Sequence, residues 1–319
     1  MKKIILFVVP VLFFVTANAQ TKWISIDSFY QPLPSSFHVY KSTDSIEGKP
    51  NIMYYVIADL KDKSLKFTTD TTFKRRLTPD QFFVKNNHPL LVVNSAFFSF
   101  ATNQNLNVVM KDGKLLGYNQ QTIAAKGNDT LTYFHSFFGA IGISKKGKAD
   151  VAWVYTDSSK RFPYASESPV HSFRDSANNL NLKLVKDKTK NESHFSKWKM
   201  KTAVGGGPVL LQNGEIKITN NEERKFSGKE INNHEPRTAI GYTKDQKLII
   251  LVCEGRSDSA AGLTLTQLAK VFKDLNCVEA LNLDGGGSSC MLINGKETNT
   301  PSSKGVQRPV PSVFLIEKK

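Results

Sequence analysis

The segment Val278-Glu279-Ala280-Leu281-Asn282-Leu283-Asp284-Gly285-Gly286-Gly287-Ser288-Ser289 joins an apolar run to a polar, glycine-rich end. A short apolar run bounded by turn residues is typical of a buried strand. Glycine loses more backbone entropy on folding than any other residue, so three consecutive glycines require a structural reason. One reason is the close approach of backbone N–H groups to an anion, and the other is a tight turn or bulge.

A second triglycine run, Gly205-Gly206-Gly207, also follows an apolar segment. Residues 92–98 and 253–256 share this layout, with polar residues at the end of an apolar run. Neither glycine run has the Gly-x-Gly-x-x-Gly or Gly-x-x-x-x-Gly-Lys spacing that leads into a helix at a nucleotide site. A nucleotide-binding loop is therefore rejected, and we expect the four segments to bring polar groups to one cleft.

Short apolar or alternating runs recur along the chain and indicate a strand-rich protein. They occupy residues 52–60, 90–93, 133–143, 151–155, 209–211, 239–242, 248–253, 278–283 and 312–316. Tight-hairpin signals accompany them at Asp112-Gly113, Lys146-Gly147, Asn213-Gly214 and Asn294-Gly295. Much of the sheet structure is therefore expected to be antiparallel.

Two helices are predicted from their capping residues. Thr78 precedes Pro79 and is followed three residues later by Gln81, a capping box. Thr264 caps the second helix, in which residues 265–275 place apolar side chains on one face and polar ones, Gln267 among them, on the other. The predicted fold class is α+β, a largely antiparallel or mixed β-sheet core with a few packed helices in a single domain.

The N-terminal residues 1–19 have the pattern of a cleavable signal peptide. Lys2 and Lys3 precede an apolar run at residues 4–15, and Ala17-Asn18-Ala19 fits a signal-peptidase site. The run is shorter than the roughly 20 residues that span a bilayer, so a membrane anchor is the weaker reading. We expect a secreted or periplasmic protein without a membrane anchor, whose domain covers residues 20–319. The polar stretch 156–201 is interpreted as an insertion or lid within it, or as a solvated loop.

The composition is that of a globular protein with an excess of positive charge. Hydrophobic residues make up 40% and charged residues 22% of the chain, and the formal net charge is +15. No helix carries a basic stripe, so an anionic small substrate or phosphate-bearing glycan is favoured over nucleic acid. Cys253, Cys277 and Cys290 are too few for a disulfide framework, although one bond is possible, and Cys253 ends an apolar run as a buried thiol would.

Acidic and basic side chains occur at the ends of predicted strands. Glu254 and Asp284 end strongly apolar runs, where a carboxylate is costly unless it is paired or faces a site. They are candidates for a catalytic pair, or else each is tied to an arginine or caps a turn. Arg237, Arg256 and Arg308 also lie near strand ends, and a guanidinium can hold a phosphate with two parallel hydrogen bonds.

Other hydrolase chemistries have little support. The six histidines show no His-x-x-x-His or His-Glu-x-x-His spacing, which argues against a zinc hydrolase. Neither Ser288 nor Ser289 lies in a Gly-x-Ser-x-Gly elbow, so a serine hydrolase is not indicated.

Six motifs in one order resemble the phosphodiester glycosidase domain family. They are Asn94-Ser95-Ala96-Phe97-Phe98, Gly205-Gly206-Gly207-Pro208-Val209-Leu210, Pro236-Arg237-Thr238-Ala239-Ile240-Gly241, Glu254-Gly255-Arg256, Gly262-Leu263-Thr264-Leu265 and Asn282-Leu283-Asp284-Gly285-Gly286-Gly287-Ser288-Ser289. The resemblance covers about residues 90–316. The family's usual Asn-Gly-Gly-Phe-Phe is replaced at one place by Asn94-Ser95-Ala96-Phe97-Phe98, which adds side chains to that loop.

The resemblance implies an exported, bacterial-type hydrolase that cleaves the bond between a sugar's anomeric carbon and a phosphodiester. Arg237, supported by Arg308, would grip the phosphate, and Asp284 and Glu254 would act around an oxocarbenium-like transition state. The remaining predicted substrate contacts are Asn94, Phe98, Gly205, Gly206, Gly207, Arg256, Gly285, Gly286, Gly287 and Ser288. No cofactor is expected, although Asp284 and Asn282 leave a divalent cation open. The alternative is a non-catalytic binding module for phosphorylated glycans. The oligomeric state stays open.

Overall fold

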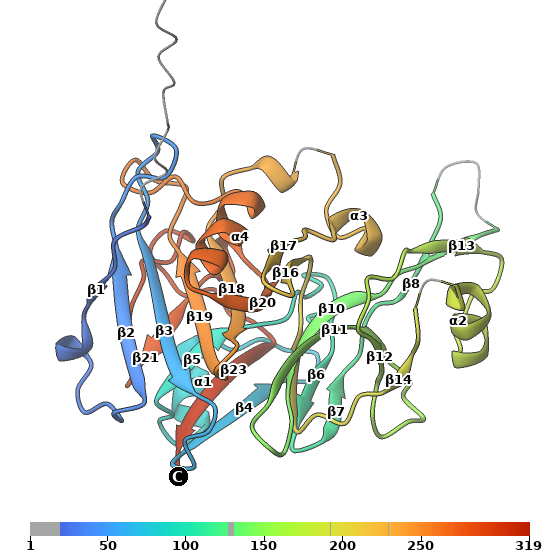
Figure 1. Cartoon of the computed structure of the whole chain (residues 1–319), viewed down its shortest axis with the longest axis horizontal. Helices are drawn as coiled ribbons and strands as arrows, with labels where there is room; N and C mark the ends of the chain where they lie inside the picture. The colour runs from blue at the N-terminus through green and yellow to red at the C-terminus, as the bar shows by residue number, and fades with distance from the viewer. Residues whose placement is uncertain (1–19, 127–130, 192, 229) are drawn as a thin grey trace, which may run out of the picture.

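The computed structural model describes residues 20–126, 131–191, 193–228 and 230–319, and the predicted signal peptide lies outside them. Four β-sheets form the molecule, with a few helices packed against them (Figure 1). Throughout the described residues the strand pairings of these sheets are antiparallel, so the mixed arrangement left open by the sequence is not found there.

The largest sheet has eight strands and joins the N-terminal strands to strands from residues 209–282. In Figure 1 the blue N-terminal strands lie directly beside the orange strands from the C-terminal half. Its spatial order is β1 (Ile24–Ser25), β2 (Phe37–Ser42), β3 (Met53–Asp59), β19 (Lys247–Cys253), β18 (Arg237–Thr243), β20 (Cys277–Asn282), β16 (Val209–Gln212) and β17 (Glu215–Ile216).

The other three sheets contain seven, five and three strands. The seven-stranded sheet runs β14 (Ser196–Lys197), β12 (Tyr164–Ser166), β11 (Ala149–Tyr155), β10 (Phe138–Ile143), β15 (Thr202–Gly205), β6 (Val109–Lys111) and β7 (Lys114–Gly117). The five-stranded sheet runs β22 (Lys296–Glu297), β21 (Met291–Ile293), β5 (Leu91–Asn94), β23 (Ser312–Lys318) and β4 (Leu65–Thr71). The small sheet contains β13 (Phe173–Asp175), β9 (Tyr133–His135) and β8 (Thr122–Ala124).

Local sequence signals located nine strand-containing runs and four hairpin turns, although strands such as β2 and β4 were not predicted. Each predicted apolar run contains a strand, although residues 133–143 divide into β9 and β10. All four predicted hairpin turns join antiparallel neighbours. Asn294 and Gly295 both adopt positive φ, at 49° and 76°, as a two-residue turn of matching twist requires.

Both predicted helices form with the expected caps. α1 (Pro79–Lys85) and α4 (Leu265–Asp274) each begin with a complete capping box. The outward-facing prediction for Gln267 was wrong, because its side chain is buried and bonds both Glu47 and the Thr264 backbone. The other helices are α2 (Leu182–Thr189), α3 (Asn220–Glu223) and the 3₁₀ turns η1 (Asp27–Phe29), η2 (Glu230–Asn232) and η3 (Gly286–Ser288). No described helix is long and apolar enough to cross a bilayer.

Residues 156–201 are part of the folded body rather than a plain solvated loop. β12 pairs with the edge of β11, and β14 pairs with β12. Val185, Phe195 and Trp198 are buried, which ties the segment to the apolar core. The apolar residues that achieve this are spaced too irregularly for either the helical or the strand period to reveal them.

Candidate functional site

The strand ends of the large sheet bring the predicted site segments together. Arg237, the first residue of β18, pairs with Cys253 at the end of β19, and Ala239 pairs with Asn282 at the end of β20. A cavity of about 370 Å³ opens at this edge, lined by Phe97, Glu235, Arg237, Arg256, Asn282, Asp284 and Gly286 among others. The predicted convergence of Arg237, the Asp284 loop and the first triglycine segment is therefore present, since Gly206 packs against the Asn282 carbonyl.

The second triglycine loop allows two arginine side chains to lie against the backbone. A Cβ added to Gly287 would fall 2.0 Å from Nη2 of Arg308, and one added to Gly286 would fall 3.2 Å from Nη2 of Arg256. Arg256 itself has φ of +66°, an uncommon conformation for a residue with a side chain, and its Nε donates to Glu235 at 2.7 Å. The glycines are therefore needed for the approach of guanidinium groups.

Asp284 is the carboxylate at the centre of this arrangement. Burial raises its pKa from 3.8 to about 6, against the opposing effects of the Ser288 hydroxyl and the positive charges of Arg308 and Lys225. The Oδ2 atom of Asp284 is buried and has no hydrogen-bond partner. A half-buried carboxylate with one unpartnered oxygen, close to several cations, is suited to accept a proton or attack an electrophilic centre.

Lys225 is a functional candidate that the sequence interpretation missed. Its Nζ lies 3.6 Å from the ring centroid of Phe97 and donates to Oδ1 of Asn107 at 3.3 Å. Burial lowers its pKa from 10.5 to about 8, although the negative charges of Glu223 and Asp284 act in the opposite direction. The segment Arg224-Lys225-Phe226-Ser227 is polar and follows α3, so no sequence pattern distinguishes Lys225 from an ordinary surface lysine.

Glu223 is a buried carboxylate next to Lys225 that anchors the surrounding backbone. Its fully buried carboxylate accepts hydrogen bonds from the Thr219 hydroxyl at 2.7 Å and from the backbone N–H groups of Val209 and Gly139 at 2.9 and 3.2 Å. Burial raises the pKa of Glu223 despite these bonds. Since it is saturated with donors and has no exposed surface, Glu223 is a positioning residue for Lys225.

The first triglycine run does not supply free donors. The N–H groups of Gly205, Gly206 and Gly207 donate to the carbonyl groups of Val108, Gly139 and Asn282 at 2.7, 2.9 and 2.8 Å. The glycines are required for close packing instead, because a Cβ on Gly206 would lie 2.2 Å from the Asn282 carbonyl oxygen. The prediction that these three glycines bind an anion is therefore wrong, and their role is structural.

The loop that follows β5 supports Asp284 from inside the protein. Asn94 is fully buried, its Nδ2 donates to the Asp284 carbonyl at 2.5 Å, and its Oδ1 accepts from Thr238 and from the backbone of Cys290. The predicted substrate contact of Asn94 is therefore corrected to a positioning contact. Ser95 and Ala96, which depart from the family pattern, are also buried and do not line the cavity.

Of the two neighbouring phenylalanines Phe97 and Phe98, it is Phe97 that lines the cavity, together with Phe226. Phe98 is buried against Phe100, with ring centroids 4.7 Å apart, whereas Phe97 lines the cavity and contacts Phe226. Alternation along extended backbone places neighbouring side chains on opposite faces, and the sequence motif did not show which of the two faces the site.

Glu254 and Arg237 have other partners than those predicted. Glu254 is buried outside the cavity lining, where its Oε1 accepts from the Thr300 backbone at 2.9 Å. Glu254 thus does not line the cavity that Asp284 lines, which argues against their predicted joint role. Arg237 does line the cavity, but its Nε and Nη2 donate to the carbonyl groups of Leu263 and Asn233, both at 2.9 Å. Arg256, which lines the cavity, is therefore the better candidate for the main phosphate contact, and Arg308, which lies against Gly287 outside the cavity lining, is a supporting one.

The three cysteines are buried free thiols, so the disulfide that the sequence left open does not form. Among the described residues, no cluster of three or more histidine, cysteine, aspartate or glutamate side chains has the geometry of a metal site. Oδ1 of Asn282 is a second buried oxygen without a partner beside Asp284 Oδ2. These two oxygens are suited to accept hydrogen bonds from a substrate's hydroxyl groups and equally to bind a cation. The expectation that no cofactor is needed therefore stays a prediction.

The geometry agrees with comparisons to known proteins. A family model described as phosphodiester glycosidase matches residues 87–317. The chain belongs to the phosphodiester glycosidase family. It is 33% identical over 101 residues to mouse N-acetylglucosamine-1-phosphodiester alpha-N-acetylglucosaminidase, a match covering 29% of this chain and 19% of the mouse protein. It is 37% identical over 87 residues to the uncharacterized SPbeta prophage-derived protein YomE of Bacillus subtilis, covering 27% of this chain and 13% of that protein.

Solved structures show the same fold. The catalytic domain of zebrafish N-acetylglucosamine-1-phosphodiester alpha-N-acetylglucosaminidase, auto-inhibited by its pro-peptide, superimposes with a TM-score of 0.60 at 20% identity, covering 94% of this chain and 89% of that domain. A hypothetical protein from Synechocystis gives a TM-score of 0.60 at 15% identity, covering 89% and 62% of the two chains. The predicted α+β fold is confirmed. The matched segments span less than a fifth of the length of the mouse and Bacillus relatives.

Proposed function

We propose that this protein is an exported hydrolase of glycosyl phosphodiesters, which breaks the bond between the anomeric carbon and the phosphate oxygen. The observation that carries the proposal is the unpartnered Oδ2 of Asp284, buried close to the cationic groups of Lys225 and Arg308. A phosphodiester presents one negative charge beside an electrophilic sugar carbon, and this arrangement complements both.

The charge states at neutral pH suit this reaction. The pKa of Asp284 is about 6 and that of Lys225 about 8, so between these values the carboxylate is ionised and the ammonium is protonated. Arg256 and Arg308, on the Gly286 and Gly287 side, are positioned to bind the non-bridging phosphate oxygens. Lys225 approaches from the side of Phe97 and adds a second positive charge.

In the proposed reaction, the C1–O bond breaks and its electron pair leaves with the phosphate, which departs as a phosphomonoester. Arginine and lysine charges stabilise the negative charge that develops on this leaving group, and such electrostatic stabilisation is often the largest single contribution to catalysis. The Asp284 carboxylate faces the positive anomeric centre, either by attacking it or by removing a proton from the attacking water. Water supplies the oxygen of the released sugar and the proton that completes the products.

The test is hydrolysis of N-acetylglucosamine 1-(methyl phosphate) and of matched diesters of other sugars, carried out in ¹⁸O-labelled water. The proposal expects a free reducing sugar that carries the label, with methyl phosphate unlabelled. Label in the phosphate would instead identify attack at phosphorus, as in a phosphodiesterase. A parallel reaction with chelator measures metal dependence.

Asp284→Asn is the matched variant, because it preserves the shape of the side chain and removes its charge. We expect its turnover to fall by about 10²–10⁴-fold, the usual range for loss of a positioned acid, base or nucleophile. Tight binding of these diesters without release of sugar by the wild-type protein would favour the binding-module alternative.

A further inference from the structure

A second cavity, of about 390 Å³, is lined mainly by lysine side chains, and we call it the lysine hollow. Four segments that are distant in the sequence bring these lysines together. They are Lys61, Lys63 and Lys66 from the β3–β4 turn and the start of β4, Lys145 and Lys146 from the β10–β11 turn, Lys201 before β15, and Lys319 after β23. Among the described residues, Asp62 is the single carboxylate side chain of the lining.

Most of the ammonium groups in the lysine hollow have no carboxylate to compensate them. Lys66 pairs with Glu317 at 2.9 Å, but within the described parts of the chain the other lysines of the hollow form no ion pair. The Asp62 carboxylate accepts hydrogen bonds from the hydroxyl groups of Ser36 and Ser64. Crowded positive charges repel one another, and a bound anion would remove that repulsion.

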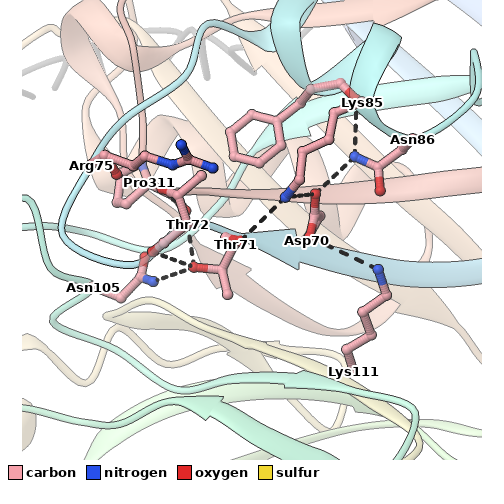
Figure 2. A network of polar contacts seen from close by, with 10 residues as sticks. Asp70, Thr71, Thr72, Arg75, Lys85, Asn86, Asn105, Lys111 and Pro311 are labelled. Carbon is pink, nitrogen blue, oxygen red and sulfur yellow. Dashed lines mark hydrogen bonds and ion pairs between the residues drawn. The ribbon is translucent and has the colours of Figure 1, made fainter.

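Lysines at the other end of β4 show a different arrangement, drawn in Figure 2. There the Asp70 carboxylate accepts a hydrogen bond from Nζ of Lys85 at 2.6 Å and lies 3.8 Å from Nζ of Lys111. It also accepts from Asn86 at 2.9 Å. The lysines at that end of the strand are thus compensated within the protein, whereas the charge of the lysine hollow is available to a ligand.

Backbone contacts fix the shape of the lysine hollow. Gly147 packs so closely that a Cβ there would lie 2.6 Å from the Leu60 carbonyl oxygen, which holds the two turns against each other. The N–H of Lys201 donates to the Ile143 carbonyl at 2.9 Å. A ligand would therefore meet a preformed wall, with little ordering cost beyond that of the lysine side chains.

The lysine hollow and the candidate site lie at opposite ends of β3. At one end, Met53 pairs with Cys253, which in turn pairs with Arg237 of the site. At the other end, β3 finishes at Asp59, directly before Leu60 in the hollow. A strand of seven residues is about 20 Å long at roughly 3.3 Å per residue, so no single phosphate group contacts both places. The hollow is therefore a separate site.

The type of cation indicates the type of anion. The described lining of the hollow has lysines and no arginine, whereas Arg237 and Arg256 line the candidate site. A planar guanidinium recognises an anion through parallel hydrogen bonds, while ammonium groups act as point charges, which suit a tetrahedral phosphate approached from several directions. Phe67, the aromatic residue of the lining, is buried and offers no platform on which nucleic-acid bases could stack.

We propose that the lysine hollow binds an oligophosphate, an anion in which several phosphate groups lie close together. A single phosphate monoester carries about two negative charges at neutral pH and would leave most of these lysines uncompensated. The volume of the hollow is within the range of about 300–1,000 Å³ typical of small-molecule sites. This binding does not depend on the hydrolysis proposed for the candidate site.

The experiment is a calorimetric titration of the purified protein with inorganic tripolyphosphate, with orthophosphate in parallel. Wild-type protein is expected to bind tripolyphosphate at least about tenfold more tightly than orthophosphate. Its affinity should fall by about tenfold between roughly 50 and 500 mM NaCl, because salt screens exposed charges. Equal affinity for the two anions, or no measurable binding of tripolyphosphate, would overturn the proposal.

Lys145→Glu combined with Lys146→Glu is the diagnostic variant, because both side chains are exposed at a turn. It should weaken tripolyphosphate binding by about tenfold or more. The matched control is Lys183→Glu combined with Lys186→Glu, two exposed lysines of α2 outside the hollow, which changes the net charge by the same amount and should bind as the wild type does. Equal losses in the two variants would reduce the binding to net charge and reject a site in the hollow.

Two further measurements locate the anion and exclude a membrane contact. Arg256→Gln, in the candidate site, should leave the affinity for tripolyphosphate unchanged, and loss of binding in this variant would place the anion in the candidate site instead. Sedimentation with vesicles of phosphatidylglycerol and phosphatidylcholine tests a bilayer surface. Vesicle binding that requires Lys145 and Lys146, without affinity for tripolyphosphate, would identify an anionic membrane as the occupant and contradict the proposal.

Discussion

Lys225 provides the sharpest test of the proposed chemistry, through the dependence of kcat/KM on pH. Asp284, with a pKa of about 6, gains a proton as the pH falls through that value, and Lys225, with a pKa of about 8, loses one as the pH rises. The two groups are charged at the same time only between these two pH values. We therefore expect a bell-shaped profile for the free enzyme, with limbs near pH 6 and pH 8.

The expected effect of removing Lys225 on kcat/KM follows from the burial of its ammonium group. Its pKa falls from 10.5 to about 8, and at 1.36 kcal/mol per unit this corresponds to about 3 kcal/mol against the charged form. A bound phosphodiester offsets this cost, because it places a negative charge beside the ammonium group. Lys225→Met should consequently lower kcat/KM by about 100-fold at pH 7.

Lys225→Arg separates the role of charge from the role of shape. Arginine stays protonated throughout the accessible pH range, so the alkaline limb should disappear even if the larger side chain lowers the plateau. The assay is kcat/KM from pH 5 to pH 10, with Lys217→Met, an exposed lysine, as control and far-UV circular dichroism to check folding. An alkaline limb that persists near pH 8 in Lys225→Arg would refute the assignment, as would wild-type kcat/KM in Lys225→Met.

Four further predictions follow from the structure. Asp284→Asn should raise the melting temperature at pH 7.5, measured by differential scanning fluorimetry. The reason is that the raised pKa of Asp284 means that its ionised carboxylate destabilises the folded state above about pH 6. Gly206→Ala should destabilise the protein by about 1–3 kcal/mol or more in urea unfolding, because its Cβ meets the backbone carbonyl of Asn282. Gly287→Ala should fold normally but raise KM, because its Cβ displaces only the flexible end of Arg308. Native protein should resist alkylation of its three cysteines by iodoacetamide at pH 8, since burial raises the pKa of every thiol; rapid labelling would contradict this.

Features that depend on neighbours in the chain were predictable from the sequence. The Thr78 and Thr264 helix caps and the four hairpin turns depend on residues within four positions of each other, and all of them form. The strand ending at Asn282 and the glycine loop after Asp284 were likewise evident from residue order alone. Both occur in the family motifs, and those motifs predicted that they lie with the other site segments at one edge of the sheet.

Contacts between distant segments decided which of these residues face the cavity. The two triglycine runs look alike in the sequence, yet Gly206 packs against the Asn282 carbonyl, while Gly286 and Gly287 leave room for arginine side chains; the N–H of Gly286, like those of Gly205–Gly207, donates to a backbone carbonyl. Lys225 occurs in a polar stretch and becomes buried only because the Phe97 loop folds over it.

The sequence by itself determined nine strand-containing runs, four hairpin turns and the family, and it singled out Asp284 as a candidate, because these depend on local spacing and on motifs that can be read in order. Only the tertiary structure decided that Asn94 supports Asp284 from inside the protein, that Glu254 lies outside the cavity lining and that Lys225 packs against Phe97 at its border. The physical reason is that burial and charge pairing depend on distances in space, and those distances are set by segments more than 100 residues apart.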